Sequence, residues 1–274
     1  MYAGMTDIAA LYHDDAYAAA VDKLWGNMVA KKMYLTGGIG ALHEGEAFGE
    51  NYELPNKTAY NETCASIGDV YWNHRLFMLY GDKKYYDVIE RTLYNGLISG
   101  LSLDGEKFFY PNALEADGVY QFNQGACTRK SWFDCSCCPS NMIRFIPAVQ
   151  GLIYAHQDRD VLVNLYVGSE AEVSVEDDVV KISQQTDYPW NGQVNITVQA
   201  QTSDLRLKLR MPGWVMGEVL PSDLYAYQNN TSAAVPTLLI DGKKQEYTIE
   251  EGYLVLDRDW SGTTQIRLTF PMEV

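Results

Sequence analysis

In the first half of the chain, apolar residues recur every three or four positions, which is the spacing of an amphipathic helix. Asp14 and Asp15 precede the first of these segments as candidate N-caps, and Gly81 follows the second. Pro147 lacks an amide donor and is expected to kink the last one. The segments predicted to be helical are 16–32, 64–80, 83–99 and 140–154.

A weak internal repeat runs through these helical segments. Residues 11–27 align with residues 79–95, and each copy has the pattern of a helix, a tight turn and a second helix. A helical hairpin cannot bury its apolar stripe alone, so repeated hairpins imply stacking or a closed α/α toroid, of which about half is present. A chance match between two ordinary hairpins stays the alternative.

From about residue 160 the hydrophobic period changes to two, which is typical of strands. Turn signals such as Asn191-Gly192 and Asp241-Gly242 separate these segments. We therefore predict an α+β multidomain protein, with a helical domain at 1–157 and an antiparallel β-sandwich domain at 158–274. The predicted strands include 161–167, 194–198, 205–211, 253–256 and 266–270.

The net charge of −15 limits the classes of partner. Nucleic acids and anionic membrane surfaces require clustered Lys and Arg, so neither is expected to bind. No stretch approaches the roughly 20 apolar residues of a membrane-spanning helix. An aromatic content of 12% fits a neutral ligand such as a sugar, although it does not prove one.

Both ends of the sequence resemble interrupted elements. Residues 1–11 read as the middle of an amphipathic helix without a signal peptide, and residues 268–274 stop within a strand pattern. We expect a fragment cut at both ends. Localisation therefore cannot be read from the terminus, although the cytoplasm is slightly favoured, and the sequence gives no oligomeric state.

All five cysteines lie in the helical half, an odd and bunched set that makes a poor disulfide framework. Cys137 and Cys138 directly precede one predicted helix, and Glu62 and Cys64 open another. Two helix N-termini that carry such ligands could converge on one Zn²⁺. The spacing differs from the common zinc modules, so buried reduced cysteines and a redox pair stay open as alternatives.

Several short motifs resemble glycoside hydrolase family 127. In the helical half they are 36–40 (TGGIG), 45–48 (GEAF), 60–65 (YNETCA) and 135–139 (CSCCP), and in the second half 184–190 and 209–214. The resemblance implies a retaining β-L-arabinofuranosidase that acts on an oligosaccharide or glycan. It also implies a partial (α/α)₆ toroid followed by a β-sandwich.

The resemblance also implies roles for individual residues. Cys137 matches the family's nucleophile and Glu46 its general acid/base, while Tyr110 resembles a tyrosine near the nucleophile. His43, three residues before Glu46, could contact a sugar hydroxyl. The implied zinc ligands are Glu62, Cys64, Cys137 and Cys138.

Two alternatives to catalysis stay open. Four protein ligands with no open position are the pattern of a structural zinc, which would suit a non-catalytic carbohydrate-binding protein. A thiol sensor would contain no metal. Because half of the barrel wall is expected to be absent, we also expect that this chain alone cannot hydrolyse a substrate.

Overall fold

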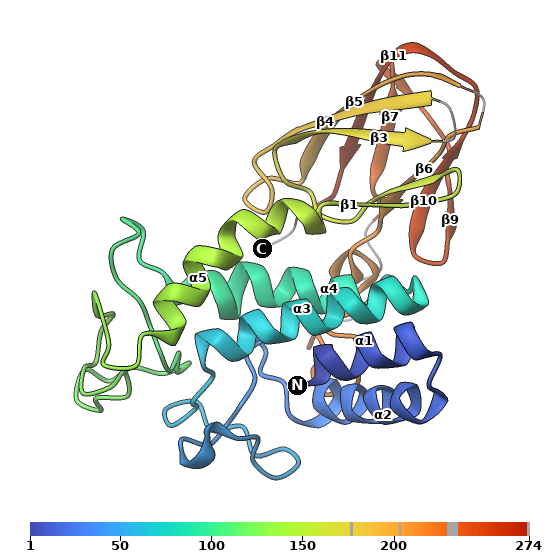
Figure 1. The fold of residues 1–274 in the computed structure, drawn as a ribbon. Coiled ribbons are helices and arrows are strands. Elements are labelled where there is room, and N and C mark those ends of the chain that lie inside the picture. The colour runs from blue at the N-terminus through green and yellow to red at the C-terminus, as the bar shows by residue number, and fades with distance from the viewer. Residues whose placement is uncertain (176–177, 203, 229–234, 273–274) are drawn as a thin grey trace. The chain divides into compact units, whose positions relative to one another are not determined.

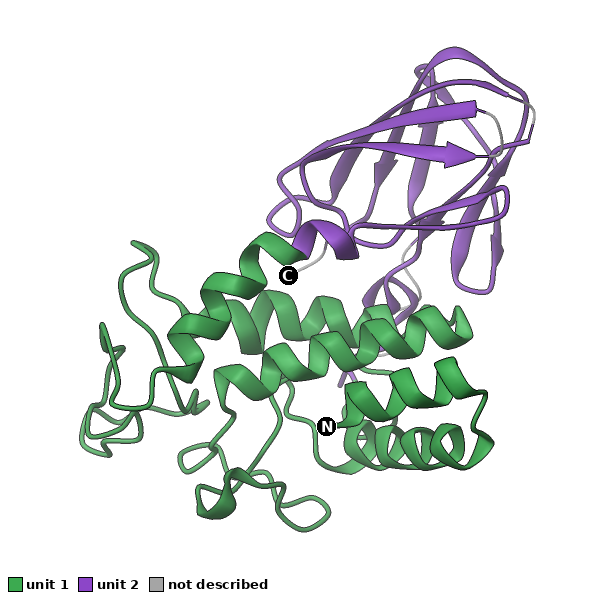
Figure 2. Cartoon of the chain, viewed as in Figure 1, with its two compact units in different colours: residues 1–148, 220–226 green, residues 149–219, 227–274 purple. Residues whose placement is uncertain are grey.

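The computed structural model describes residues 1–175, 178–202, 204–228 and 235–272. The chain forms two compact units (Figure 2). One comprises residues 1–148 with 220–226, and the other residues 149–219 with 227–274. The first is helical and the second is built from two β-sheets, as the change of hydrophobic period predicts. In the described residues no helix is long and apolar enough to cross a membrane.

The helical unit begins with two helical hairpins that match the internal repeat. They are α1 (Tyr2–Tyr12) with α2 (Asp15–Lys31), and α3 (Thr63–Tyr80) with α4 (Lys84–Arg91). His13 and Gly81 end the first helix of each hairpin in the left-handed conformation, with φ of 52° and 71°. The Asp14 side chain caps α2, as predicted, because it accepts hydrogen bonds from the backbone amides of Ala16 and Tyr17.

The last two predicted helices need correction. The segment expected at 83–99 leaves the α-helical form after Arg91 and continues as a π-helical turn (Thr92–Leu97) and a 3₁₀ turn (Ile98–Gly100). The segment expected at 140–154 is α5 (Cys137–Ala148), which begins three residues earlier. It contains Pro147 in its last turn and passes into a 3₁₀ turn (Val149–Leu152). Proline cannot donate the next helical hydrogen bond, which accounts for the early end.

The core of the helical unit combines aromatic packing with paired polar groups. Trp25 of α2 packs edge-on against Tyr85, with 4.9 Å between ring centroids. Its indole Nε1 donates to Asn73 Oδ1 at 2.7 Å, and the indole of Trp72 donates to Thr6 Oγ1 at 3.1 Å. Buried polar atoms are costly unless they are paired, so these bonds fix the helices in register.

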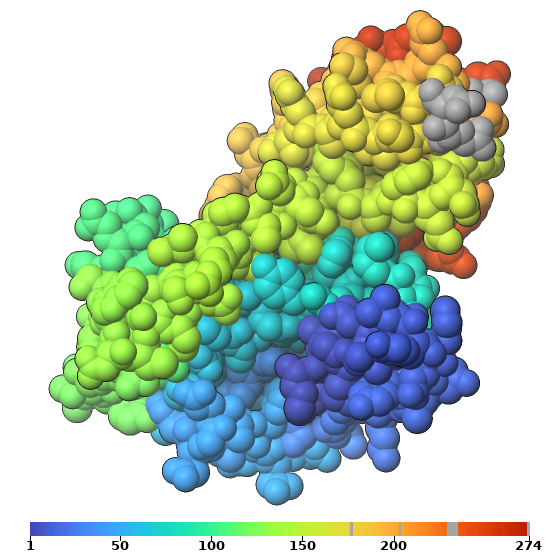
Figure 3. Space-filling view, in the orientation of Figure 1, coloured from blue at the N-terminus to red at the C-terminus, as the bar shows by residue number. Residues whose placement is uncertain are grey.

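The two long loops of this unit, residues 32–62 and 101–136, lie at the end where α3 and α5 begin (Figure 1). They border one another on the surface, light blue beside green (Figure 3), and Leu114 N donates to Asn56 O at 3.1 Å. The glycines of 36–40 pack directly on the π-helical turn. A Cβ on Gly37 would lie 2.7 Å from Thr92 Cα, and one on Gly96 would lie 2.9 Å from Gly38 N. Only glycine allows this backbone approach.

The second unit contains a five-stranded sheet, β1-β2-β6-β10-β9, and a six-stranded sheet, β3-β4-β5-β11-β7-β8. Their strands are β1 (Tyr154–Gln157), β2 (Asp160–Val163), β3 (Ser169–Val175), β4 (Asp178–Thr186), β5 (Gln193–Thr202), β6 (Arg206–Arg210), β7 (Thr237–Ile240), β8 (Lys243–Lys244), β9 (Thr248–Glu250), β10 (Tyr253–Asp257) and β11 (Trp260–Thr269). The antiparallel prediction fails at one pair, because β2 and β6 run parallel. Leu207, Leu254, Ile196 and Leu268 are among the core residues.

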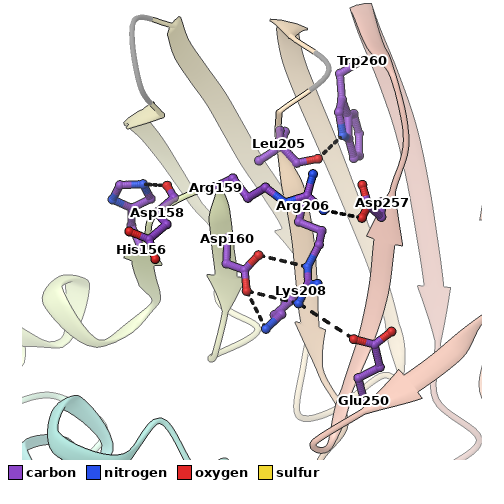
Figure 4. Close-up of polar contacts among 10 residues, drawn as sticks. All are labelled: His156, Asp158, Arg159, Asp160, Leu205, Arg206, Lys208, Glu250, Asp257 and Trp260. Atoms are coloured by element: carbon purple, nitrogen blue, oxygen red, sulfur yellow. Dashed lines mark hydrogen bonds and ion pairs between the residues drawn. The ribbon is translucent and has the colours of Figure 1, made fainter.

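Charged side chains form a network on the five-stranded sheet (Figure 4). Asp160 pairs with Arg206 Nε at 3.0 Å and with Lys208 Nζ at 2.6 Å. Arg159 pairs with Asp257 at 2.6 Å. Every charge in this group therefore has an opposite charge within reach.

Candidate functional site

Four ligand-type side chains meet where α3 and α5 begin. Glu62 is the N-cap residue of α3 and Cys64 lies in its first turn, while Cys137 and Cys138 open α5. One ligand atom from each lies within 4.8 Å of all the others. The helical ends therefore bring together the four residues that the resemblance names as metal ligands.

The cluster is compact and mostly shielded from solvent. The sulfurs of Cys137 and Cys138 are 3.8 Å apart, and they lie 3.5 Å and 3.4 Å from Glu62 Oε1. Cys138 is fully buried and Glu62 is 9% exposed. In a tetrahedral site with bonds of about 2.0–2.3 Å, the ligand atoms would be separated by about 3.3–3.8 Å. The three distances agree with that geometry.

The protonation of the cluster reflects this crowding. Burial, followed by the negative charge of Glu46, raises the pKa of Glu62. Burial raises the pKa of Cys137 to about 12, and the hydrogen bond to Cys64 together with burial raises that of Cys138 far above its usual range. That same bond lowers the pKa of Cys64. Of the three thiols in the cluster, only Cys64 has its pKa shifted toward the thiolate form.

No described Lys, Arg or His forms an ion pair with Glu62. A buried carboxylate beside three thiols is costly unless something offsets its charge. The donor set of three sulfurs and one oxygen is one that Zn²⁺ accepts. The residues present therefore fit a soft divalent metal ion.

Glu46 lies on an exposed loop beside this cluster. It ends a 3₁₀ turn (Glu44–Glu46), and the backbone bonds between Leu42 and Ala47 close the loop. Its own φ of 50° is left-handed, a conformation that costs a side chain about 1–3 kcal/mol and is often found at functional sites. Tertiary contacts must therefore hold Glu46 in place.

Tyr110 lies beside both Glu46 and the cysteine loop. Its hydroxyl donates to Glu46 Oε1 at 3.3 Å and lies 3.9 Å from Cys135 Sγ. The Tyr110 amide donates to Asn123 Oδ1 at 2.8 Å, which anchors the residue. Burial, together with the interaction with Cys137, raises the pKa of Tyr110 above its usual range, so the phenol stays protonated.

Tyr60 is a site residue that the sequence interpretation did not identify. Its hydroxyl donates to Glu46 Oε1 at 2.7 Å, although the residue is only 4% exposed. Its position in the motif 60–65, two residues before Glu62, is the signal that could have identified it. The His43 ring stands edge-on to Tyr60 at 4.7 Å, so His43 borders the site through this contact. Burial lowers the pKa of His43.

Backbone bonds tie the start of α3 to both loops. Asn61 N donates to Gly40 O at 2.8 Å, so the glycine-rich loop places the segment that carries Tyr60 and Glu62. On the other side, Thr63 N donates to Tyr110 O at 3.1 Å. Cys127 and Cys135 are free cysteines outside the four-residue group.

Comparison with known proteins gives consistent matches. The model of the GH127 catalytic domain, described as beta-L-arabinofuranosidase, matches residues 2–151, and that of the GH127 middle domain matches residues 160–272. A non-reducing end beta-L-arabinofuranosidase of Bifidobacterium longum subsp. longum is 34% identical over 281 residues. That alignment covers 99% of this chain and 40% of the relative.

Two solved structures agree in fold over the whole chain. A GH127 beta-arabinofuranosidase is 51% identical with a TM-score of 0.92, and the match covers 100% of this chain and 42% of the other. A GH127 beta-L-arabinofuranosidase from Geobacillus stearothermophilus T6 is 38% identical with a TM-score of 0.86, covering 100% and 41%. The chain thus spans about two fifths of the length of these relatives.

Proposed function

Because the chain belongs to glycoside hydrolase family 127, we propose that it carries the catalytic residues of a retaining hydrolase that releases L-arabinofuranose-type sugars from a glycan. Its helical unit would then be part of an (α/α)₆ toroid. The observation that supports catalysis most directly is the hydrogen bond of 3.3 Å from the Tyr110 hydroxyl to Glu46 Oε1, together with the influence of Cys137 on the pKa of the same hydroxyl. The proposed proton donor and the proposed nucleophile therefore both lie near one phenol.

The first step would be attack by Cys137. Its sulfur forms a bond to the anomeric carbon while the bond from that carbon to the leaving oxygen breaks, and Glu46 gives that oxygen a proton. In the second step Glu46 takes a proton from water, whose oxygen attacks the same carbon. The carbon–sulfur bond breaks and its electron pair returns to Cys137. Two inversions give retention.

The metal would serve the nucleophile. The residues that would hold Zn²⁺ are Glu62, Cys64, Cys137 and Cys138. When bound, the ion would keep the thiols deprotonated at neutral pH. This matters because burial, with the neighbouring Cys64 and Glu62, raises the pKa of Cys137 to about 12.

A second candidate function follows from the same donor set. Four protein ligands with no open position are the pattern of a structural zinc. On that interpretation the cluster joins two helix ends in a non-catalytic carbohydrate-binding protein. Glu46 would then be an ordinary loop acid.

The test is Cys137→Ser in the full natural protein that contains these residues. We expect its kcat/KM on an aryl β-L-arabinofuranoside to fall at least about a thousandfold. Mass spectrometry of the unaltered protein during turnover should show one pentose attached to Cys137. Cys127→Ser is the matched control, because Cys127 lies outside the cluster, and it should retain activity within about twofold. Sugar binding without hydrolysis by the unaltered protein would favour the second function.

A further inference from the structure

Tyr60 contributes the shorter of the two hydrogen bonds to Glu46. The distance from its hydroxyl to Oε1 is 2.7 Å, against 3.3 Å for Tyr110. A bond from a phenol to a carboxylate at this length is among the stronger hydrogen bonds in proteins. Neither the resemblance nor the spacing of the motifs gives this residue a role.

The Tyr60 side chain is held rigidly. It is 4% exposed, and its backbone is bound on both sides, with Tyr60 N donating to Ala41 O at 3.3 Å and Asn112 N donating to Tyr60 O at 2.9 Å. The His43 ring packs against it at 4.7 Å. The Tyr60 hydroxyl therefore has a fixed position beside the loop that carries Glu46.

Glu46, by contrast, has little support of its own. It is exposed on a short loop with a left-handed backbone. A glutamate side chain in that setting samples several rotamers, whereas proton transfer needs the carboxyl within hydrogen-bond reach of the leaving oxygen. A rigid donor on one carboxyl oxygen removes that freedom.

We propose that Tyr60 is a positioning residue that holds the Glu46 carboxyl in place for proton transfer. Both hydroxyls donate to Oε1, so a proton carried by the carboxyl resides on Oε2. Tyr60 thereby selects which oxygen meets the substrate. This assignment rests on the proposed function, because it requires Glu46 to be the general acid.

Leaving groups of different basicity separate positioning from a general structural effect. A sugar alkoxide is a poor leaving group and needs the proton, whereas a nitrophenolate departs largely without it. A residue that aligns the acid should therefore matter for the first and little for the second. Loss of packing would reduce both equally.

The experiment is Tyr60→Phe in the full natural protein, with kcat/KM as the readout because it reports the step in which the leaving group departs. For an arabinose disaccharide we expect a fall of about 10–100-fold, within the contribution of acid–base catalysis. For the p-nitrophenyl glycoside we expect a fall of less than about threefold. In a Glu46→Gln background, Tyr60→Phe should change neither rate further.

Tyr34→Phe is the matched control. Tyr34 is 1% exposed in the same unit, and its hydroxyl donates to Pro55 O at 3.2 Å. Its removal should change both substrates by the same small factor. An equal fall for both substrates in Tyr60→Phe, or no fall, would overturn the assignment. If the unaltered protein hydrolyses neither substrate, the proposed function fails first, and this assignment fails with it.

Discussion

The two units differ in whether their acidic side chains are paired with cations. On the five-stranded sheet, Asp160 is paired with two cations and Asp257 with one, all of them partly exposed (Figure 4). The helical unit has surface pairs too, but it also buries Glu62 and Asp69, and no described Lys, Arg or His pairs with either.

This difference separates an ordinary charged surface from a candidate functional site. Partly exposed ion pairs cost little to form and contribute little to stability. A buried carboxyl without a cation lowers stability, so it persists where something else depends on it. Glu62 meets three thiols at the start of two helices, which is the setting of a metal site rather than of a core.

The largest expected effect comes from removing one of the proposed metal ligands. Cys138→Ser should lower the bound metal from about one ion per chain to a small fraction, since a closed donor set loses affinity when a thiolate is replaced. The helical unit should then unfold at a lower temperature than in the unaltered protein. Elemental analysis and calorimetry measure the two effects.

Cys127→Ser should leave both values unchanged, because Cys127 is not part of the cluster. A chelator should reproduce the effect of Cys138→Ser in the unaltered protein. Equal metal content in Cys138→Ser and in the unaltered protein would show that the cluster is not the metal site. The contrast between a charged surface in one unit and a metal site in the other would then fail.

An effect of intermediate size is expected from Asp69, which is 2% exposed. Burial raises its pKa to about 7, whereas the unfolded chain releases the proton near 3.8. The folded state therefore binds more protons between these values, and the free energy of unfolding falls as pH rises from about 4 to 7. Asp69→Asn should remove this dependence and stabilise the protein by about 1–3 kcal/mol at pH 8.

Urea unfolding at pH 4, 6 and 8 measures this dependence. Asp69 accepts a hydrogen bond from Asn73 Nδ2 at 2.9 Å. In Asp69→Asn, the amide oxygen of the new side chain can accept the same bond. Asp160→Asn is the opposite case, since it removes the partner of two cations and should destabilise the protein. The same pH dependence in the unaltered protein and in Asp69→Asn would contradict the assignment.

The smallest effect is expected at the edge of the charged network. Asp257 pairs with Arg159 at 2.6 Å, and both side chains are more than 40% exposed. Asp257→Asn should change the free energy of unfolding by less than about 1 kcal/mol, and by less still at high salt. A loss of several kcal/mol at 1 M salt would contradict this prediction, because it would show that the Asp257–Arg159 pair stabilises the fold as strongly as a buried contact does.

The sequence pattern predicted the features that depend on residues close together along the chain, such as helix starts and helix ends. The first turn of α2 and the left-handed end at Gly81 follow from a local hydrogen bond and from the conformational freedom of glycine, so the sequence predicts both. The π-helical turn at Thr92–Leu97 could not, because it is set by the glycine loop that packs on it. The parallel pairing of β2 with β6 likewise depends on residues more than 40 positions apart.

The sequence by itself determined which ligand types this protein carries and that they stand at two helix starts. The family resemblance implied that Glu62, Cys64, Cys137 and Cys138 share one site, and the tertiary structure shows that they converge. Only the tertiary structure decided that the buried Tyr60 reaches the exposed Glu46. The reason is physical. Residue chemistry and helix ends are local properties, whereas the distances between side chains on separate loops depend on how those loops pack against α3.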